Sequence, residues 1–215
     1  MMMNLFSVFD PVTGMLSMNW LSMTLLIFYP TMFWNMLSKL NLIIMKMMMS
    51  LFMEITANFK KTKFSIFFIS MFMFILANNI MGLLPYVFTA SSHMLFSLSL
   101  ALSMWIALMM FGWLNFTNKM FTHLVPTGTP IVLMPFMVMI ETVSNIIRPG
   151  SLAVRLTANM IAGHMLMSLL GNNMLSTMLL LLMWLSMLLM LFESAVAIIQ
   201  SYVFMTLSTL YSSEI

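Results

Sequence analysis

The fold is decided by Phe64-Ser-Ile-Phe-Phe-Ile-Ser-Met-Phe-Met-Phe-Ile-Leu-Ala-Asn-Asn-Ile-Met-Gly82, a stretch in which no side chain carries a charge. The uncharged sequence extends well beyond it, because no Asp, Glu, Lys or Arg occurs between Lys63 and Lys119, and none between Arg155 and Glu193. About 20 apolar residues are enough for a helix to cross a bilayer. Both intervals are far longer, so we expect an all-α polytopic membrane protein.

The composition supports this class and excludes others. Of the 215 residues, 62% are hydrophobic and only 6% are charged, which leaves too little polar surface for a soluble globule. Cysteine is absent, so neither a disulfide framework nor a thiolate metal site can form. The net charge of +3 comes with a cluster of lysines between residues 39 and 63, which is typical of a positive-inside loop and does not indicate a nucleic-acid partner.

The apolar pattern predicts a single membrane domain, residues 1–215, with about five membrane helices plus an amphipathic surface helix. Lys119 and the lysine-rich surface helix fall on one side of the membrane, and the N-terminus falls on the other. The predicted segments are a first span over residues 15–34, the surface helix over 35–63, a second span over 64–86, a third over 93–116, and a long tilted C-terminal helical hairpin built from 131–170 and 174–211.

The two arms of this hairpin are unusually long. At 1.5 Å per residue the first arm would measure ~60 Å, about twice the thickness of the hydrocarbon layer, so it has to tilt or bend. Pro149-Gly150 predicts an interruption in this arm, and Gly171-Asn-Asn173 predicts a turn between the arms.

Arg155 is the most informative single residue, because it lies in the apolar, small-residue stretch from Ser151 to His164. A charge at the centre of a bilayer costs about 3 kcal/mol or more on insertion scales, and such residues commonly line an ion or proton path. The alternative is a structural ion pair, or a side chain that snorkels to the interface from a helix beginning at Leu152.

The other polar groups of the hairpin are few. His164 follows Arg155 by nine residues, which places it on roughly the opposite face and ~13 Å further along the helix. Spacings of mostly three or four predict one polar stripe on the first arm, with a possible change of phase at Pro149-Gly150; its members are Glu141, Ser144, Asn145, Arg148, Ser151, Arg155 and Asn159.

The second arm carries Glu193 and Gln200, which are seven residues apart and therefore share a face. In an antiparallel hairpin, one register brings Glu193 level with His164 and Gln200 level with Arg155. That register is centred beyond the Gly171–Asn173 turn, so we expect a longer loop or an offset second helix. A carboxylate beside an imidazole can relay protons, although a neutral packing pair would have the same spacing.

Methionine is abundant, with 33 residues at no fixed helical phase. Thioethers bind Cu(I), so a methionine-lined copper transporter is one alternative function. Methionine also serves as a flexible apolar filler, and we favour this reading. A structural subunit of a respiratory complex is the other alternative, and it would tolerate loss of Arg155.

Four motifs carry a resemblance to a known family: Ile140-Glu-Thr-Val-Ser144, Ser151-Leu-Ala-Val-Arg-Leu-Thr-Ala-Asn159, Ala162-Gly-His164, and Glu193-Ser-Ala-Val-Ala-Ile-Ile-Gln-Ser-Tyr-Val-Phe204. With them the chain resembles subunit a of the F-type ATP synthases, in its animal mitochondrial version. The resemblance covers most of the chain and implies the proton-conducting stator beside a rotating ring of c subunits.

The resemblance also implies residue roles. Arg155 would be the family's essential arginine, facing the ring carboxylate, with Gln200 and Asn159 as its polar neighbours. His164 and Glu193 would form the half-channel from the intermembrane space. Glu141 would be the acid of the matrix-side half-channel, whereas Arg148 has no role that the resemblance supplies.

The same resemblance implies the surroundings of the chain. Its partners would be the ring of c subunits, the peripheral stalk and other membrane-sector subunits, and a lipid bilayer that includes cardiolipin. The transported ion would be H⁺, with no cofactor, and ATP chemistry would occur on partner subunits. The protein would be a multi-pass protein of the mitochondrial inner membrane, with its N-terminus in the intermembrane space and the Lys39–Lys63 loop in the matrix.

Overall fold

The computed structural model describes residues 5–12, 14, 17–28, 39–58, 64–84, 87–125, 128–172 and 179–214. Every regular element in these ranges is an α-helix or a 3-10 helix. The predicted all-α class is therefore confirmed.

Four helices in the described ranges are long and apolar enough to cross a membrane. They are α2 (Ser65–Gly82), α3 (Met94–Asn115), α5 (Met134–Asn172) with the short turn η5 (Ile131–Leu133) before it, and α6 (Leu179–Glu214). Of the predicted first span, residues 18–28 form the 3-10 helix η2 (Met18–Phe28), while residues 15, 16 and 29–34 lie outside the described part of the chain.

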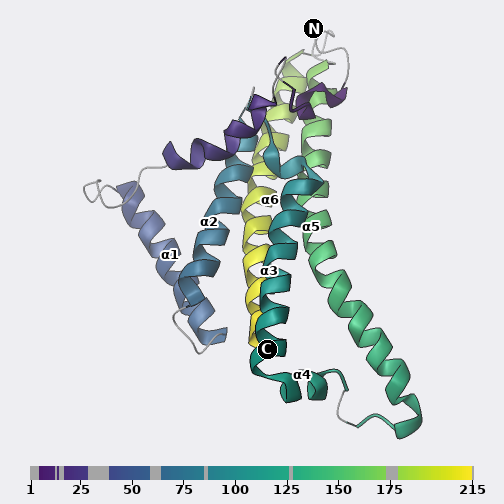
Figure 1. Ribbon diagram of the computed structural model, residues 1–215. Helices are drawn as coiled ribbons and strands as arrows, with labels where there is room; N and C mark the ends of the chain where they lie inside the picture. The colour runs from purple at the N-terminus through teal and green to yellow at the C-terminus, as the bar shows by residue number, and fades with distance from the viewer. Residues whose placement is uncertain are drawn as a thin grey trace.

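The four long helices form one bundle, in which α6 packs against both α2 and α5, and α3 packs against α5 (Figure 1). The 3-10 helix η4 (Ala90–Ser92) connects the ends of α2 and α3 and also touches α5. The short helix α4 (Thr117–His123) lies across the end of the bundle where the C-terminus is found, and the N-terminal 3-10 helix η1 (Leu5–Phe9) lies at the opposite end.

Helix α1 (Lys39–Asn58) occupies most of the segment that we predicted as a surface helix. Its Leu51 and Ile55 are buried in a cluster with Phe68 and Phe72 of α2. Toward α6, the hydroxyl of Tyr202 donates a hydrogen bond of 3.1 Å to Oε2 of Glu54. The apolar side of α1 is thus used against the bundle. The lysines at positions 60, 61 and 63 lie outside the described residues.

The prediction that Pro149-Gly150 interrupts the first arm of the hairpin is wrong, because α5 is one helix that contains Pro149. A proline inside a helix removes one backbone hydrogen bond and pushes against the carbonyl four residues earlier. In a membrane segment, neighbouring groups can satisfy the freed backbone, so the helix continues and bends. Figure 1 shows the part of α5 nearest η5 slanting away from the bundle, and the remainder running beside α6.

The interior of the bundle contains polar as well as apolar side chains, and many large apolar side chains are exposed on its outside. Asn79, Gln200 and Ser201 are buried, whereas Ile147, Trp184 and Leu188 are exposed. Many serine and threonine hydroxyls donate to a carbonyl three residues earlier in their own helix, as Ser97 does to Met94. Such local bonds let a hydroxyl lie in an apolar setting without a partner on another helix. This pattern is typical of a helix bundle surrounded by lipid.

Candidate functional site

Arg155 lies on the outer surface of the hairpin. Its neighbours in the helix, Leu152 and Leu156, are almost fully buried against the bundle, and the helical period turns Arg155 outward, where it is exposed. Within the part of the chain that the structure describes, no hydrogen bond or ion pair is made by its guanidinium. The arginine is therefore available to a group that the described part of the chain does not provide.

Small side chains continue this outward face of α5. Ala158, Asn159 and Ala162 are exposed, and they follow Arg155 by three, four and seven residues, so they form one stripe with it. Ala153, by contrast, is fully buried inside the bundle. Stripes of small residues allow another helix to approach closely in a membrane. Here the stripe faces away from the chain's own helices.

Gln200 lies behind this stripe and fixes the register of the hairpin. Its side chain is buried, and its Oε1 accepts a hydrogen bond of 3.0 Å from Nδ2 of Asn159. The sequence placed Gln200 level with Arg155, one helical turn before Asn159. The predicted antiparallel register thus agrees with the structure to within one turn.

Glu193 lies against the backbone of α5. A Cβ atom built on Gly163 would lie only 2.8 Å from Cδ and 2.9 Å from Oε1 of Glu193. Glycine is therefore required at position 163 for the carboxyl group to occupy this place. The adjacent residue in the chain is His164, so the structure brings the two predicted partners to the same level of the hairpin.

The side chains of His164 and Glu193 are not hydrogen-bonded to one another. Nε2 of His164 and both carboxyl oxygens of Glu193 are buried without a hydrogen-bond partner among the described residues. Buried polar atoms of this kind are normally satisfied by protein groups or by ordered water. The predicted pair is therefore a half-buried imidazole near a buried carboxyl group and not a closed ion pair.

Further buried polar groups lie in the bundle. Nδ2 of Asn78 donates to the carbonyl of Phe74 in its own helix. Asn79 is fully buried, and neither atom of its amide has a partner in the described ranges, which is also true of the Ser91 hydroxyl. Ser91 belongs to η4, which packs on α2 and α5. The bundle core thus contains polar groups suited to hold water.

The N-terminal segment covers the His164 end of the hairpin. The Phe9 ring meets the His164 ring edge to face, with 6.2 Å between the ring centroids. The carbonyl of Phe9 lies 3.0 Å from Nε2 of His93. The ring of His93 packs against the rings of Trp20 and Phe88. No feature of the sequence linked Phe9 to His164.

Glu141 lies apart from the other predicted residues. It precedes Arg155 by fourteen positions, which corresponds to ~21 Å along α5. Its Oε1 is 3.6 Å from an Nη atom of Arg148, and both side chains are about one-quarter exposed. The spacing of seven residues between Glu141 and Arg148 places both on one face of the helix, so the sequence contains the signal for this pair, although the resemblance supplies no role for Arg148.

The described residues contain no group of three or more His, Cys, Asp or Glu side chains that could hold a metal ion. The buried methionines Met104 and Met205 pack in an apolar cluster with Phe68 and Phe72. Their surroundings are those of apolar filler residues.

Together these features define a polytopic helical membrane protein of the ion-translocating class. An arginine, a half-buried histidine and a buried glutamate on membrane helices are costly in lipid, and such groups mark ion and proton paths.

Comparison with known proteins identifies the family. The family described as ATP synthase A chain matches residues 15–213. The chain is 54% identical to ATP synthase subunit a of Locusta migratoria, 53% to that of Drosophila melanogaster and 52% to that of Anopheles gambiae, in each case over the full length of both chains. The chain belongs to the ATP synthase subunit a family, and it is a proton-translocating, multi-pass subunit of the membrane sector of a mitochondrial ATP synthase.

Proposed function

We propose that the chain provides two offset half-channels, through which protons reach and leave the carboxyl groups of a rotating ring of c subunits. The observation that carries this proposal is the exposure of Arg155 on a stripe of small residues, where the described part of the chain offers it no acid. A carboxylate on a closely packed partner helix is the group that this surface would receive.

The charge of Arg155 sets what happens to such a carboxyl group. In lipid a carboxyl group is neutral, because burial in a medium of low dielectric disfavours its ionised form. Beside a fixed positive charge the ionised form is favoured. A ring carboxyl that passes Arg155 would therefore release its proton on one side and take up another before it returns to lipid.

Glu193 and His164 are suited to the uptake side, which we assign to the intermembrane space. Both are ionisable groups at one level of the hairpin, and Nε2 of His164 and the two carboxyl oxygens of Glu193 are buried without a partner among the described residues. Water between them would give a continuous path for protons. Asn159 and Gln200, joined by their hydrogen bond, lie between this level and Arg155 and hold the hairpin together there.

Glu141 is suited to the release side, which we assign to the matrix. It lies ~21 Å from Arg155 along α5, in the direction opposite to His164. The two acidic sites therefore stand at different depths, with the positive charge of Arg155 between them. A fixed cation also blocks protons from passing directly between the two sites. Each proton that crosses delivers about 2.3 kcal/mol per 100 mV of membrane potential to the rotation.

The remaining surface fits an assembled membrane sector. Large apolar side chains are exposed along α5 and α6, among them Ile161, Leu191, Phe192 and Ile199. We assign this surface to the ring, to the peripheral stalk and other membrane-sector subunits, and to bilayer lipids, cardiolipin among them. Protons are the transported ion, no cofactor is needed, and ATP chemistry takes place on the partner subunits.

The substitution Arg155→Ala tests the proposal in the assembled enzyme. ATP-driven proton pumping and ATP synthesis should both fall to background, because the ring carboxyl then has no fixed charge to ionise it. Assembly should be retained, since removing an arginine from the centre of a membrane helix lowers its insertion cost by about 3 kcal/mol. The measurements are proton pumping in membrane vesicles and the amount of complex on a native gel.

Leu95→Ala, at an exposed apolar position of α3, is the control and should leave pumping unchanged. Normal coupled synthesis in the Arg155→Ala enzyme would contradict the proposal and would favour the purely structural role that we considered from the sequence.

A further inference from the structure

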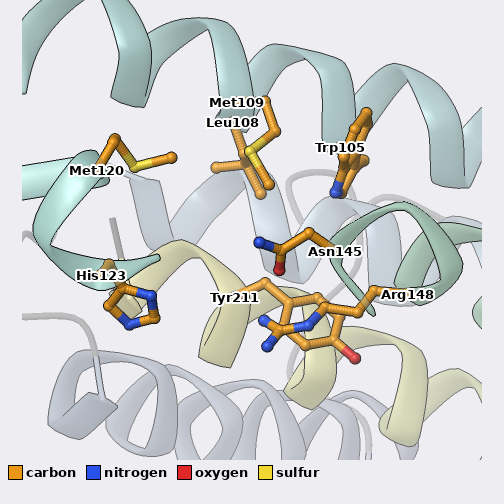
Figure 2. A pocket seen from close by; sticks show the side chains of 8 residues that line it. All are labelled: Trp105, Leu108, Met109, Met120, His123, Asn145, Arg148 and Tyr211. Atoms are coloured by element: carbon orange, nitrogen blue, oxygen red, sulfur yellow. The ribbon is translucent and has the colours of Figure 1, made fainter. Parts of the chain in front are cut away.

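The side chain of Arg148 is held between two helices of the bundle. Its guanidinium carbon lies 5.0 Å from the centroid of the Tyr211 ring, which belongs to α6. Figure 2 shows the guanidinium stacked over that ring. A cation over an aromatic face is attracted by the electrons of the ring. Tyr211 therefore fixes where the positive charge of Arg148 can lie.

From this position Arg148 reaches back along its own helix to Glu141. The distance of 3.6 Å between an Nη atom and Oε1 is an ion pair, and it joins two half-buried side chains. An exposed pair of this kind exchanges readily with water. Here the Arg148 guanidinium is held in place by the Tyr211 ring, and its ion pair with Glu141 holds the Glu141 carboxylate in place as well.

Arg148 also borders a small cavity of about 40 Å³, which is lined by both apolar and polar side chains. This volume is enough for a water molecule. Nε1 of Trp105 is buried there without a partner in the described part of the chain, and Asn145 projects its amide toward Arg148 and Tyr211 (Figure 2). The titratable or charged side chains at this cavity are His123 of α4, Arg148 of α5 and Tyr211 of α6, while α3 contributes Trp105, Leu108 and Met109.

We infer that Arg148 is a positioning residue for Glu141. Braced by the ring of Tyr211, it holds the Glu141 carboxylate at a fixed place on the path by which protons leave. The inference rests on the proposed role of Glu141 in that path. It differs from a role as a simple connection between α5 and α6, because it requires that Arg148 act through Glu141.

Four variants of the assembled enzyme test this inference: Glu141→Gln, Arg148→Gln, Arg148→Lys and the double variant Glu141→Gln/Arg148→Gln. The measurement is ATP-driven proton pumping for each amount of assembled complex. We expect Arg148→Gln to lower pumping about tenfold, since a misplaced proton-transfer group is costly, and Arg148→Lys to restore part of the loss. In the Glu141→Gln background, Arg148→Gln should cause no further loss.

A loss from Arg148→Gln that is equally large in both backgrounds would overturn the inference and indicate a structural connection. Normal pumping in Arg148→Gln beside impaired pumping in Glu141→Gln would also overturn it, while leaving the proposed function intact. Normal pumping in Glu141→Gln would show instead that the proposed exit role of Glu141 is wrong, and the inference would fail with it.

Tyr211 provides a second test that does not depend on how well the Arg148 variants assemble. Tyr211→Phe keeps the aromatic face and should pump normally. Tyr211→Leu removes that face while keeping an apolar side chain, and it should lower pumping about threefold, in the range of one cation–π contact. This loss should disappear in the Glu141→Gln background. Equal pumping by the Leu and Phe variants would contradict the proposal that the aromatic ring of Tyr211 holds Arg148 in place.

Discussion

At the scale of single residues, the site is organised by what each polar group touches. Asn159 and Gln200 satisfy one another, Glu141 is paired with Arg148, and Arg155 has no partner among the described residues. Polar atoms of His164 and Glu193 also have no partner there, but Arg155 is the one of these three side chains that always keeps its charge, which is costly in lipid. This contrast directs the functional argument to Arg155 and assigns supporting roles to the others.

Gly163→Ala should lower proton pumping without preventing assembly. The added Cβ would lie 2.8 Å from Cδ of Glu193, which is too close, and the atoms in its way are the end of a flexible side chain. The carboxyl group would therefore move while the helices stay in place, and we expect a loss on the order of tenfold. Pumping per assembled complex is the measurement.

Gly171→Ala is the matched control for this prediction, because a Cβ there meets nothing within 4 Å. It should pump like the unmodified enzyme. If Gly163→Ala also pumps normally, the position of the Glu193 carboxyl is not important for proton flow. Glu193→Asp combined with Gly163→Ala should recover part of the activity, since Asp is shorter by one methylene group.

The sequence predicted some of these contacts and could not predict others. Glu193 and His164 were placed at one level because helical spacing within a hairpin is regular. Two contacts depend on how closely α6 approaches α5: that of the Glu193 side chain with Gly163, and that of the Tyr211 ring with Arg148. The spacing of residues along the sequence does not determine this distance between the helices. The contact of Phe9 with His164 joins residues far apart in the sequence, and no local sequence pattern predicts it.

At the scale of helices, the informative case is α5. Pro149-Gly150 is a strong breaking signal in a soluble protein, and it led us to expect an interruption. In the structure α5 continues through it. Ending the helix within the membrane would leave several backbone groups without hydrogen bonds in lipid, and this costs more free energy than bending the helix. The described part of α6 runs from Leu179 to Glu214, whereas the choice between a longer loop and an offset second helix concerns residues 173–178, which lie outside the described part of the chain.

The register of α5 and α6 can be tested with introduced cysteines, because the chain has none of its own. In Gly163→Cys/Glu193→Cys, the new Sγ at position 193 takes the place of Cγ, which lies 3.1 Å from the Cβ built at position 163. This spacing suits a disulfide with an S–S bond of about 2.0 Å. We expect rapid cross-linking on mild oxidation, detected by mass spectrometry of linked fragments.

The control pair for this prediction is Gly163→Cys/Ser186→Cys. Ser186 lies seven residues before Glu193 on the same helix, a separation of ~10 Å, so its thiol should not reach position 163. Equal or faster cross-linking of the control pair would mean that the register is shifted by about two turns.

At the scale of the whole molecule, the helices decide the depth at which each group lies. His164 and Glu141 are twenty-three residues apart on one helix, which corresponds to ~35 Å, slightly more than the hydrocarbon thickness of about 30 Å. η1 packs at the His164 end of α5, while α4 and Tyr211 lie near the Arg148 end. The two acidic sites therefore lie toward opposite ends of the bundle, as the two proposed half-channels would require.

The number of crossings can be determined by labelling single cysteines with a thiol reagent that does not cross membranes. Suitable exposed positions are Asp10 near η1, Lys119 in α4 and Ser213 near the end of α6. We expect Lys119→Cys and Ser213→Cys to be labelled from the same side, because α5 and α6 together cross twice. Asp10→Cys should be labelled only from the other side, as a membrane crossing within residues 15–34 and the positive-inside rule both require.

Labelling of Asp10→Cys and Lys119→Cys from one side would show that this segment does not cross, and the N-terminus would then lie with the lysine-rich loop. The His164 end of α5 would still lie at the opposite surface, so η1 could not cover it in the membrane, and the contact between Phe9 and His164 would have to be abandoned.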